Sequence, residues 1–255
     1  MIIYFSATGN SEFVADKIAD VTNDTAFSIT EIKNKIVLKD GEQLGIVTPT
    51  YFWGLPSYVN EFMGNIQIEN ADNSYIYYIA TYGTTAGQAD YYIKKHLKNK
   101  GLTLNASYGI KTVDNWTVWF DVNDKNKIQE ISDEEDKQIN QIIEPVIGQK
   151  RVFISKDKKP LWLCAFAQVF YKSARKTSHL KVSDDCIGCA ICESLCPVQA
   201  IKIIDNKPQW ITDRCSMCFK CLHNCPEFAI NYDNKTQKHG QYKHYKYKKG
   251  CKKAL

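Results

Sequence analysis

The sequence predicts an α/β fold, a doubly wound parallel sheet with helices on both faces, followed by a small α+β domain. Apolar, strand-like runs alternate with helical patterns over residues 1–150. Polar or glycine-containing loops follow three of those runs, and eight of the ten cysteines lie between Cys186 and Cys225. Alternation of strand and helix is typical of parallel sheets, whereas such a local density of cysteines is typical of metal ligation.

The composition allows one sizeable domain and a smaller one. The chain has 255 residues, of which 44% are hydrophobic and 24% charged, as in ordinary globular proteins. No basic-then-apolar leader precedes the first strand. The longest apolar run, residues 161–170, is shorter than the roughly 20 residues that a membrane-spanning helix needs. We therefore expect a cytoplasmic protein without a transmembrane segment, and the composition excludes a chain that is disordered throughout.

The first loop joins an apolar strand, residues 2–5, to a helical pattern that begins near residue 10. Hydroxyl and backbone N–H groups at a helix N-terminus can surround a phosphate without a cationic side chain. Such loops also cap helices that bind nothing, so an anion site and a plain helix cap both remain open from this loop alone. The loop consists of Ser6, Ala7, Thr8, Gly9, Asn10 and Ser11.

Two further loops follow the apolar runs 43–48 and 74–80, and helical patterns come after each, at 58–63 and 86–98. Ligands of parallel sheets bind at the carboxyl ends of the strands, where all three loops should meet. The aromatic residues of the second loop could instead be core residues, although prolines and a glycine place them in a loop. The residues of interest are Pro49, Thr50, Tyr51, Phe52, Trp53 and Gly54 in the second loop, and Thr81, Tyr82, Gly83 and Gly87 in the third.

A strand at 107–113 and an amphipathic helix at 128–143, which Pro145 should end, complete the predicted domain of residues 1–150. No G-x-G-x-x-G follows any strand, which argues against a nicotinamide cofactor. No G-x-x-x-x-G-K-[ST] occurs either, which argues against a nucleotide triphosphatase.

Residues 1–150 resemble the flavodoxin family through these three loops, and the resemblance implies flavin mononucleotide (FMN). The first loop would bind the FMN phosphate, and the second and third loops would flank the flavin ring. Gly54 would let its peptide turn a carbonyl toward the flavin N5, which favours the one-electron-reduced flavin. The implied phosphate ligands are Ser6, Thr8, Asn10 and Ser11, and the implied stacking residues are Tyr51, Trp53 or Tyr82. Trp116, Trp119 and Phe120, in a later loop, either cap the flavin or only close the domain.

The cysteines form an internal repeat with the spacing C-x2-C-x2-C-x3-C-P. Three thiolates spaced in this way can wrap one face of a cuboidal iron–sulfur cluster, while the fourth points away and ligates the other cluster. Zinc knuckles, the alternative, use C-x2-C pairs that are separated by longer gaps. One cluster should therefore be held by Cys186, Cys189, Cys192 and Cys225, and the other by Cys215, Cys218, Cys221 and Cys196.

Residues 183–234 resemble the bacterial two-cluster ferredoxin family, which implies two [4Fe–4S] clusters. Between the two cysteine runs, residues 201–211 should form a short hairpin around Asp205-Asn206, and Trp210 should pack beside a cluster. A module of this size has little apolar core, so we expect it to need its clusters in order to fold.

The connector, residues 151–182, contains an apolar helical pattern at 161–171 with basic flanks. This helix could lie on a membrane surface or pack between the two domains. Cys164 within it should be a buried thiol. Cys251, in the tail, is not expected to be a ligand because eight cysteines already fill two clusters.

The tail, residues 235–255, carries eight lysines and no acidic residue, so the body of the protein is net negative. It could fold back over the acidic ferredoxin-like domain, dock an acidic redox partner, or stay disordered. Its alternating aromatic and basic residues could also suggest nucleic acid. The redox context argues against that partner, and we expect none.

Together the two halves resemble the fused flavodoxin–bacterial ferredoxin proteins of anaerobes. The first hypothesis is an electron-transfer protein that passes electrons between two [4Fe–4S] clusters and FMN, within one chain or across a homodimer, with redox proteins as partners. The second is a flavin-dependent reductase whose clusters feed FMN for a small acceptor such as a quinone or oxygen. Against the second, the flavin half has only one histidine, His96, and no acid–base constellation. A structural or nucleic-acid-binding iron–sulfur protein, the third class, would leave the three flavin loops unused.

Overall fold

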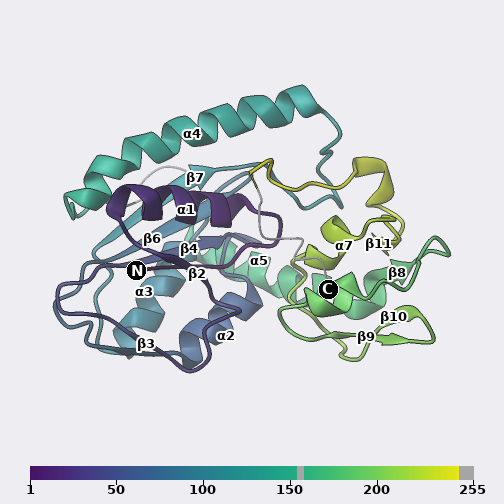
Figure 1. The fold of residues 1–255 in the computed structure, drawn as a ribbon, viewed down its shortest axis with the longest axis horizontal. Coiled ribbons are helices and arrows are strands. Elements are labelled where there is room, and N and C mark those ends of the chain that lie inside the picture. Colours follow the sequence, from purple (N-terminus) through teal and green to yellow (C-terminus); the bar gives the residue numbers. More distant parts are fainter. Residues whose placement is uncertain (154–157, 247–255) are drawn as a thin grey trace.

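The computed structural model describes residues 1–153 and 158–246 (Figure 1). Its centre is a five-stranded sheet in the order β2-β1-β4-β6-β7, and all neighbouring strands are parallel. The chain goes from β1 to β2 on one side and then to β4 on the other side of β1, so the strand order reverses between β1 and β4. In sheets of this kind a crevice opens at the carboxyl ends of the two strands at such a switch point. The strands are β1 (Ile2–Tyr4), β2 (Ala26–Ser28), β4 (Leu44–Pro49), β6 (Ile76–Tyr82) and β7 (Ala106–Lys111).

Helices cover both faces of the sheet. Helices α1 and α4 lie on one face, and α2 and α3 on the other (Figure 1). Alternate residues of β1 explain this, since Ile2 packs toward α1 and α4 whereas Ile3 packs toward α2 and α3. The predicted doubly wound parallel sheet is confirmed. The four helices are α1 (Asn10–Thr22), α2 (Ser57–Asn65), α3 (Ala89–Asn99) and α4 (Lys125–Ile147).

Three features of this half differ from the prediction. The edge strand β2, which pairs with β1, was not predicted. A small parallel pair, β3 (Lys35–Val37) and β5 (Gln67–Glu69), was not predicted. Helix α4 does not stop before Pro145 but includes it near its C-terminal end. The next residue, Val146, is fully buried against the sheet and holds that end of the helix in place.

The cysteine region, residues 177–234, contains two antiparallel strand pairs and two short helices. Asp205 and Asn206 both have left-handed φ angles, of 50° and 59°, and form the predicted hairpin turn. An unpredicted pair joins the two ends of the region. Its elements are β8 (Leu180–Val182), α6 (Ile191–Ser194), β9 (Ile201–Ile204), β10 (Lys207–Trp210), α7 (Lys220–Asn224) and β11 (Ile230–Tyr232), preceded by the short 3-10 helix η1 (Thr177–His179).

Helix α5 (Leu161–Ala174) connects the two halves and touches both. The Tyr171 hydroxyl donates to Ser216 O at 2.6 Å and accepts from Ser57 N–H at 3.1 Å. One face of α5 therefore packs between the two halves, and Cys164 is fully buried as expected. The opposite face is exposed and apolar, with Trp162, Phe166, Val169 and Phe170.

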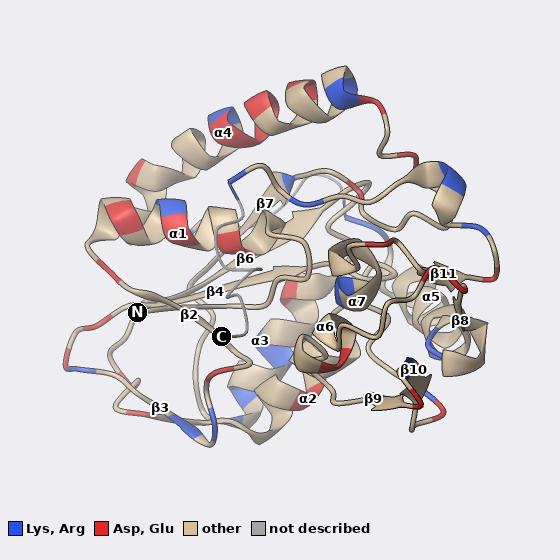
Figure 2. Ribbon diagram, turned by 45° about the vertical axis from the view of Figure 1, so that its right-hand side comes forward, with Lys and Arg blue, Asp and Glu red and all other residues tan. Residues whose placement is uncertain are grey.

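Charges of both signs occur along α1 and α4 (Figure 2). The described part of the tail, which includes the 3-10 helix η2 (Gln237–His239), packs on both halves rather than on the cysteine region alone. Cys251 lies outside the described residues. Among the helices that the structure describes, none is both long and apolar enough to cross a membrane.

Candidate cofactor sites

The loop of residues 6–11 lies at the carboxyl end of β1 and leads into α1. Gly9 adopts a left-handed φ of 104°, and its N–H donates to Ser6 Oγ at 3.0 Å. Thr8 Oγ1 accepts from Asn115 Nδ2 at 2.7 Å. Both hydroxyls therefore act as acceptors here and keep their own protons for an anion. The helix N-terminus adds backbone N–H groups, so the loop can bind a phosphate.

The side chain of Asn10, an expected phosphate ligand, makes three hydrogen bonds within the protein. Its Nδ2 donates to Thr112 Oγ1 at 3.1 Å and to Val113 O at 3.0 Å, and its Oδ1 accepts from the Tyr242 hydroxyl at 2.8 Å. The side chain is thus fully occupied within the protein, and Asn10 can offer a phosphate only its backbone N–H. Ser11 Oγ is similarly paired with Thr81 Oγ1, at 2.8 Å.

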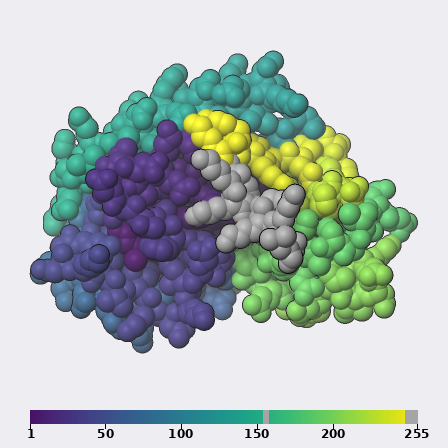
Figure 3. All heavy atoms as spheres, viewed as in Figure 1, coloured from purple at the N-terminus to yellow at the C-terminus, as the bar shows by residue number. Residues whose placement is uncertain are grey.

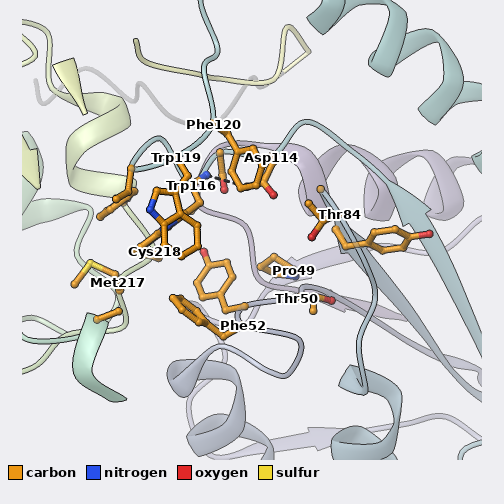
Figure 4. Close-up of a pocket in the computed structure, with 18 of the residues that line it drawn as sticks. Pro49, Thr50, Phe52, Thr84, Asp114, Trp116, Trp119, Phe120, Met217 and Cys218 are labelled. Carbon is orange, nitrogen blue, oxygen red and sulfur yellow. Dashed lines mark hydrogen bonds between the residues drawn. The ribbon is translucent and has the colours of Figure 1, made fainter. Parts of the chain in front are cut away.

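A cavity of about 940 Å³ opens beside this loop (Figure 4). Its volume is at the upper end of the roughly 300–1,000 Å³ of small-molecule sites. Thirteen of the sixteen predicted flavin residues line it: Ser6, Ala7, Thr8, Asn10, Ser11, Pro49, Thr50, Tyr51, Phe52, Trp53, Thr81, Tyr82 and Gly83. The other three, Gly9, Gly54 and Gly87, lie in the same loops but do not line the cavity, and their lack of a side chain lets the loop backbone pack closely. A Cβ on Gly87, for example, would lie 2.5 Å from Trp53 Cα and nearer still to its carbonyl oxygen.

The second loop is a strained turn that hydrogen bonds from helix α5 stabilise. Phe52 and Trp53 have left-handed φ angles of 47° and 62°, which are unfavourable for bulky residues. Gln168 Nε2 donates to the carbonyls of Tyr51 and Phe52, both at 2.9 Å. Gly54 O accepts from Tyr51 N–H at 2.9 Å, so the predicted turn of this carbonyl toward flavin N5 stays a prediction.

Aromatic side chains from three parts of the chain form the opposite wall. Trp116, Trp119 and Phe120 all line the cavity, which favours a capping role over mere closure of the domain. Trp116 stacks face to face on Phe219 of the cysteine region, with ring centroids 4.7 Å apart and an interplanar angle of 2°. Phe52 meets Trp116 edge-on at 5.6 Å.

The cavity residues fit a flavin. Aromatic walls suit a flat ring system, and two buried polar atoms beside them, Thr50 Oγ1 and Trp116 Nε1, lack a hydrogen-bond partner within the described residues. Buried polar groups are normally paired, so both are suited to the polar atoms of a bound heterocycle.

The eight repeat cysteines line two small cavities in the pairing that the sequence predicted. One is lined by Cys186, Cys189, Cys192 and Cys225, and the other by Cys196, Cys215, Cys218 and Cys221. Burial, followed by the neighbouring thiols Cys189, Cys225 and Cys186, raises the pKa of Cys192 to about 11. No three His, Cys, Asp or Glu side chains in the described parts of the chain are placed to hold a single metal ion.

The backbone of the two cysteine loops repeats as well. Gly188 and Met217, at equivalent positions, have φ angles of 69° and 51°, and Ala190 and Phe219 have 61° and 57°. The N–H groups of Ala200 and Ala229 donate to Cys196 Sγ and Cys225 Sγ at 3.2 and 3.3 Å. Four thiols around each cavity, with N–H groups aimed at sulfur, are a donor set that fits an iron–sulfur cluster.

Comparison with known families agrees with this geometry. Residues 1–141, more than half of the chain, match the model of the flavodoxin domain. The chain belongs to the flavodoxin family. Residues 179–226 match the model of a 4Fe-4S dicluster domain, so the flavodoxin domain is fused to a ferredoxin-like one, as the sequence resemblance implied. A flavodoxin domain implies a flavin, and a 4Fe-4S domain implies an iron–sulfur cluster.

The curated relatives match shorter segments. A ferredoxin-like protein in the nif region of Nostoc sp. is 36% identical over 47 residues, which are 18% of this chain and 40% of that protein. An uncharacterised protein of Methanocaldococcus jannaschii is 34% identical over 70 residues, 28% of this chain and 27% of that protein. The chain thus spans less than half the length of either relative.

Two solved flavodoxins show weak overall similarity. The Megasphaera elsdenii flavodoxin is 19% identical, with a TM-score of 0.33, and the match covers 53% of this chain and 97% of that one. The Streptococcus pneumoniae flavodoxin is 14% identical, with a TM-score of 0.34 and coverage of 55% and 97%. The fold assignment therefore rests on the strand order and the family match.

Sequence reasoning missed Asp114, which lines the cavity of the flavodoxin domain from the loop after β7. Burial raises the pKa of its carboxyl group, while a hydrogen bond from Trp116 N–H at 3.1 Å acts in the opposite direction. No motif marks this aspartate. Its position depends on the pairing of β7 with β6, which places it against Gly83 of the third loop.

Replacing Asp114 with asparagine should remove a pH dependence from FMN binding. The raised pKa means that Asp114 loses its proton at a higher pH than an exposed aspartate, and above that pH a negative charge faces an anionic ligand. FMN affinity of the wild type should therefore fall by a few-fold as pH rises through this window. Fluorescence titrations across pH measure the FMN affinity of the wild type and of Asp114→Asn. The FMN phosphate titrates equally in both, so the difference between the two pH profiles reports Asp114 alone. If the affinity of the two proteins for FMN depended on pH in the same way, the charge of Asp114 would have no effect on FMN binding.

Proposed function

We propose that this protein binds one FMN and two [4Fe–4S] clusters and passes electrons between them. When bound, the clusters supply single electrons and the flavin holds one or two. The observation that carries the proposal is that Cys218 and its neighbour Met217 line both the flavin cavity and the cavity of Cys196, Cys215 and Cys221. A cluster held by those four thiols would be in contact with the wall of the flavin site.

The same observation supports an order for the two sites. Cys186, Cys189, Cys192 and Cys225 line no part of the flavin cavity, so we propose that their site is the distal one. Aromatic side chains line the cavity on this side: Trp116 stacks on Phe219 of the cysteine region, and the buried Tyr171 lies beside Phe52.

An EPR experiment on two cysteine variants tests this order. A paramagnetic cluster speeds the relaxation of a one-electron-reduced flavin close to it. Rapid relaxation should persist in Cys225→Ala, which disrupts the distal site, and should be lost in Cys196→Ala, which disrupts the proximal site. The buried thiol variant Cys164→Ala, outside both cavities, is the control. The proposed order is wrong if the distal variant alone loses the rapid relaxation.

A second candidate function, reduction of a small acceptor such as a quinone or oxygen, has one observation in its favour. The cavity extends beyond the flavin loops to a polar end that includes His179, Asp233 and Lys235. His179 Nδ1 and Asp233 Oδ2 are 2.7 Å apart, a pairing that sequence reasoning missed. Such a pair can hold or deliver a proton beside a bound acceptor. Steady turnover with a quinone, lost in His179→Gln, would favour this function over simple electron transfer.

Partners and assembly are also proposals. Redox proteins that donate or accept electrons are the partners we propose, and a homodimer stays a prediction that light scattering can test. A cytoplasmic location likewise remains a prediction.

A further inference from the structure

The described end of the tail lies across the junction of the two halves. In Figure 3 its yellow atoms lie against the purple N-terminal region, between α4 and the green cysteine region. We call residues 239–246 the strap. It touches the cysteine region at one end and the phosphate-binding loop at the other, although its residues are more than two hundred positions from that loop in sequence.

The first end of the strap is held by α7 and the residue that follows it. Gln241 Nε2 donates to Leu222 O at 2.6 Å and to Cys225 O at 2.8 Å. Tyr242 N–H donates to His223 Nδ1 at 3.2 Å. The other ring nitrogen of His223 lies 3.0 Å from Asn115 O and donates to it, so this buried histidine joins α7, the strap and the flavodoxin domain.

The second end is held by the phosphate-binding loop and the helices behind it. His244 N–H donates to Thr8 O at 2.7 Å. The His244 ring stacks on Phe13 of α1, with centroids 4.3 Å apart, and its Nε2 lies 3.5 Å from Glu135 Oε2 of α4. Both the His244 and the Glu135 side chains are fully buried. This end is therefore packed into the flavodoxin domain and not merely laid on its surface.

Tyr242 makes the contact that matters most for the ligand. Its hydroxyl is the donor to Asn10 Oδ1, and it is 4% exposed. The amide nitrogen of Asn10 is fixed by Thr112 and Val113, so Tyr242 completes the set of bonds that immobilises this side chain. Asn10 is the first residue of α1, and its backbone N–H is among those that a phosphate would meet.

We propose that Tyr242 is a positioning residue for the flavin site, and that the strap couples the order of the cysteine region to FMN binding. The inference rests on the proposed FMN site. Because the strap is anchored on Leu222, which follows Cys221, and on the carbonyl of Cys225 itself, loss of order there would release the strap and loosen Asn10. Coupling of this kind is reciprocal, so bound FMN also steadies the cysteine region.

The test compares FMN with riboflavin, which lacks the phosphate. Flavin is removed from the full-length, iron-loaded protein, and each ligand is titrated back by fluorescence. Tyr242→Phe should weaken FMN binding about five- to ten-fold, the effect of one net hydrogen bond, and leave riboflavin binding unchanged. Tyr245→Phe is the matched control. Its hydroxyl is on the same strap but donates to Asp136 at 3.4 Å, away from the loop, and it should change neither affinity.

Each outcome has a distinct meaning. An unchanged FMN affinity in Tyr242→Phe overturns the positioning role. An equal loss of FMN and riboflavin affinity also overturns it, because the strap would then only hold the two halves together. Failure of the wild type to bind FMN at all would instead count against the proposed function. For the coupling, Gln241→Ala should free the strap from Leu222 and Cys225, loosen the Tyr242–Asn10 contact and lower FMN affinity more than riboflavin affinity, and no change would refute it.

Discussion

Replacing Cys225 with alanine should release iron from the site of Cys186, Cys189 and Cys192. The site of Cys215, Cys218 and Cys221 should stay intact, although these cysteines precede Cys225 directly in the sequence. The reciprocal change, Cys196→Ala, should release iron from the site of Cys215, Cys218 and Cys221. Each variant should lose about half of the iron, since each removes one ligand of one of two proposed cubane clusters. The reason is geometric, because each fourth cysteine lines the cavity of the other triplet.

Alkylation of the folded protein, followed by mass spectrometry of its peptides, identifies the site that has opened. In Cys225→Ala the reactive thiols should be Cys186, Cys189 and Cys192, while the other four stay protected. Cys164→Ala should lose no iron, because its buried thiol lies outside both cavities. Alkylation of Cys215, Cys218 and Cys221 in Cys225→Ala would show that each run holds its own cluster, and would refute the exchange of ligands.

Replacing Gly87 with alanine should weaken FMN binding at least ten-fold and destabilise the fold by roughly 2–4 kcal/mol. Gly87 has a left-handed φ of 56°, and an added Cβ would press against the backbone of Trp53. Backbone cannot move aside as a flexible side chain can, so the second flavin loop must shift. Trp53 O also accepts from Gln88 N–H at 2.9 Å, and that shift would strain this bond as well.

Gly101→Ala is the matched control for this change. Gly101 has a left-handed φ of 76°, but nothing lies within 4 Å of the position that a Cβ would take. It should therefore show only the conformational cost, roughly 1–2 kcal/mol, and no change in FMN affinity. Urea unfolding and FMN titration of both variants separate the two effects. Equal effects of the two substitutions on FMN binding would mean that the packing of Gly87 on Trp53 does not shape the site.

The sequence predicted those parts of the sites that depend on local chemistry. Buried parallel strands appear as apolar runs, so β1, β4 and β6 and the loops after them could be placed without a structure. The cysteine spacing predicts that Cys196 and Cys225 are exchanged between two clusters, because three residues carry the fourth thiol out of its own loop. In the structure each of the two lines the cavity of the other triplet, and the ligation itself stays a prediction.

The parts that escaped prediction depend on long-range contacts. Asp114 reaches the flavin cavity through the pairing of β7 with β6, and His179 through the pairing of β8 with β11. Tyr242 lies in a tail whose alternating aromatic and basic residues did not indicate where the tail packs, yet it contacts Asn10 of the flavodoxin domain. Met217 takes the left-handed conformation of Gly188 although no propensity favours it, because the repeated cysteine loop imposes that shape.

The most direct test of the account is a census of cofactors on anaerobically purified protein. Iron, acid-labile sulfide and released flavin are measured per chain, before and after reconstitution with FMN. The account predicts about eight iron and eight sulfide, as two cubane clusters require, together with about one FMN. Eight iron without flavin, even after FMN is added, would contradict the central claim that the cavity beside Cys218 is a flavin site in electronic contact with a cluster.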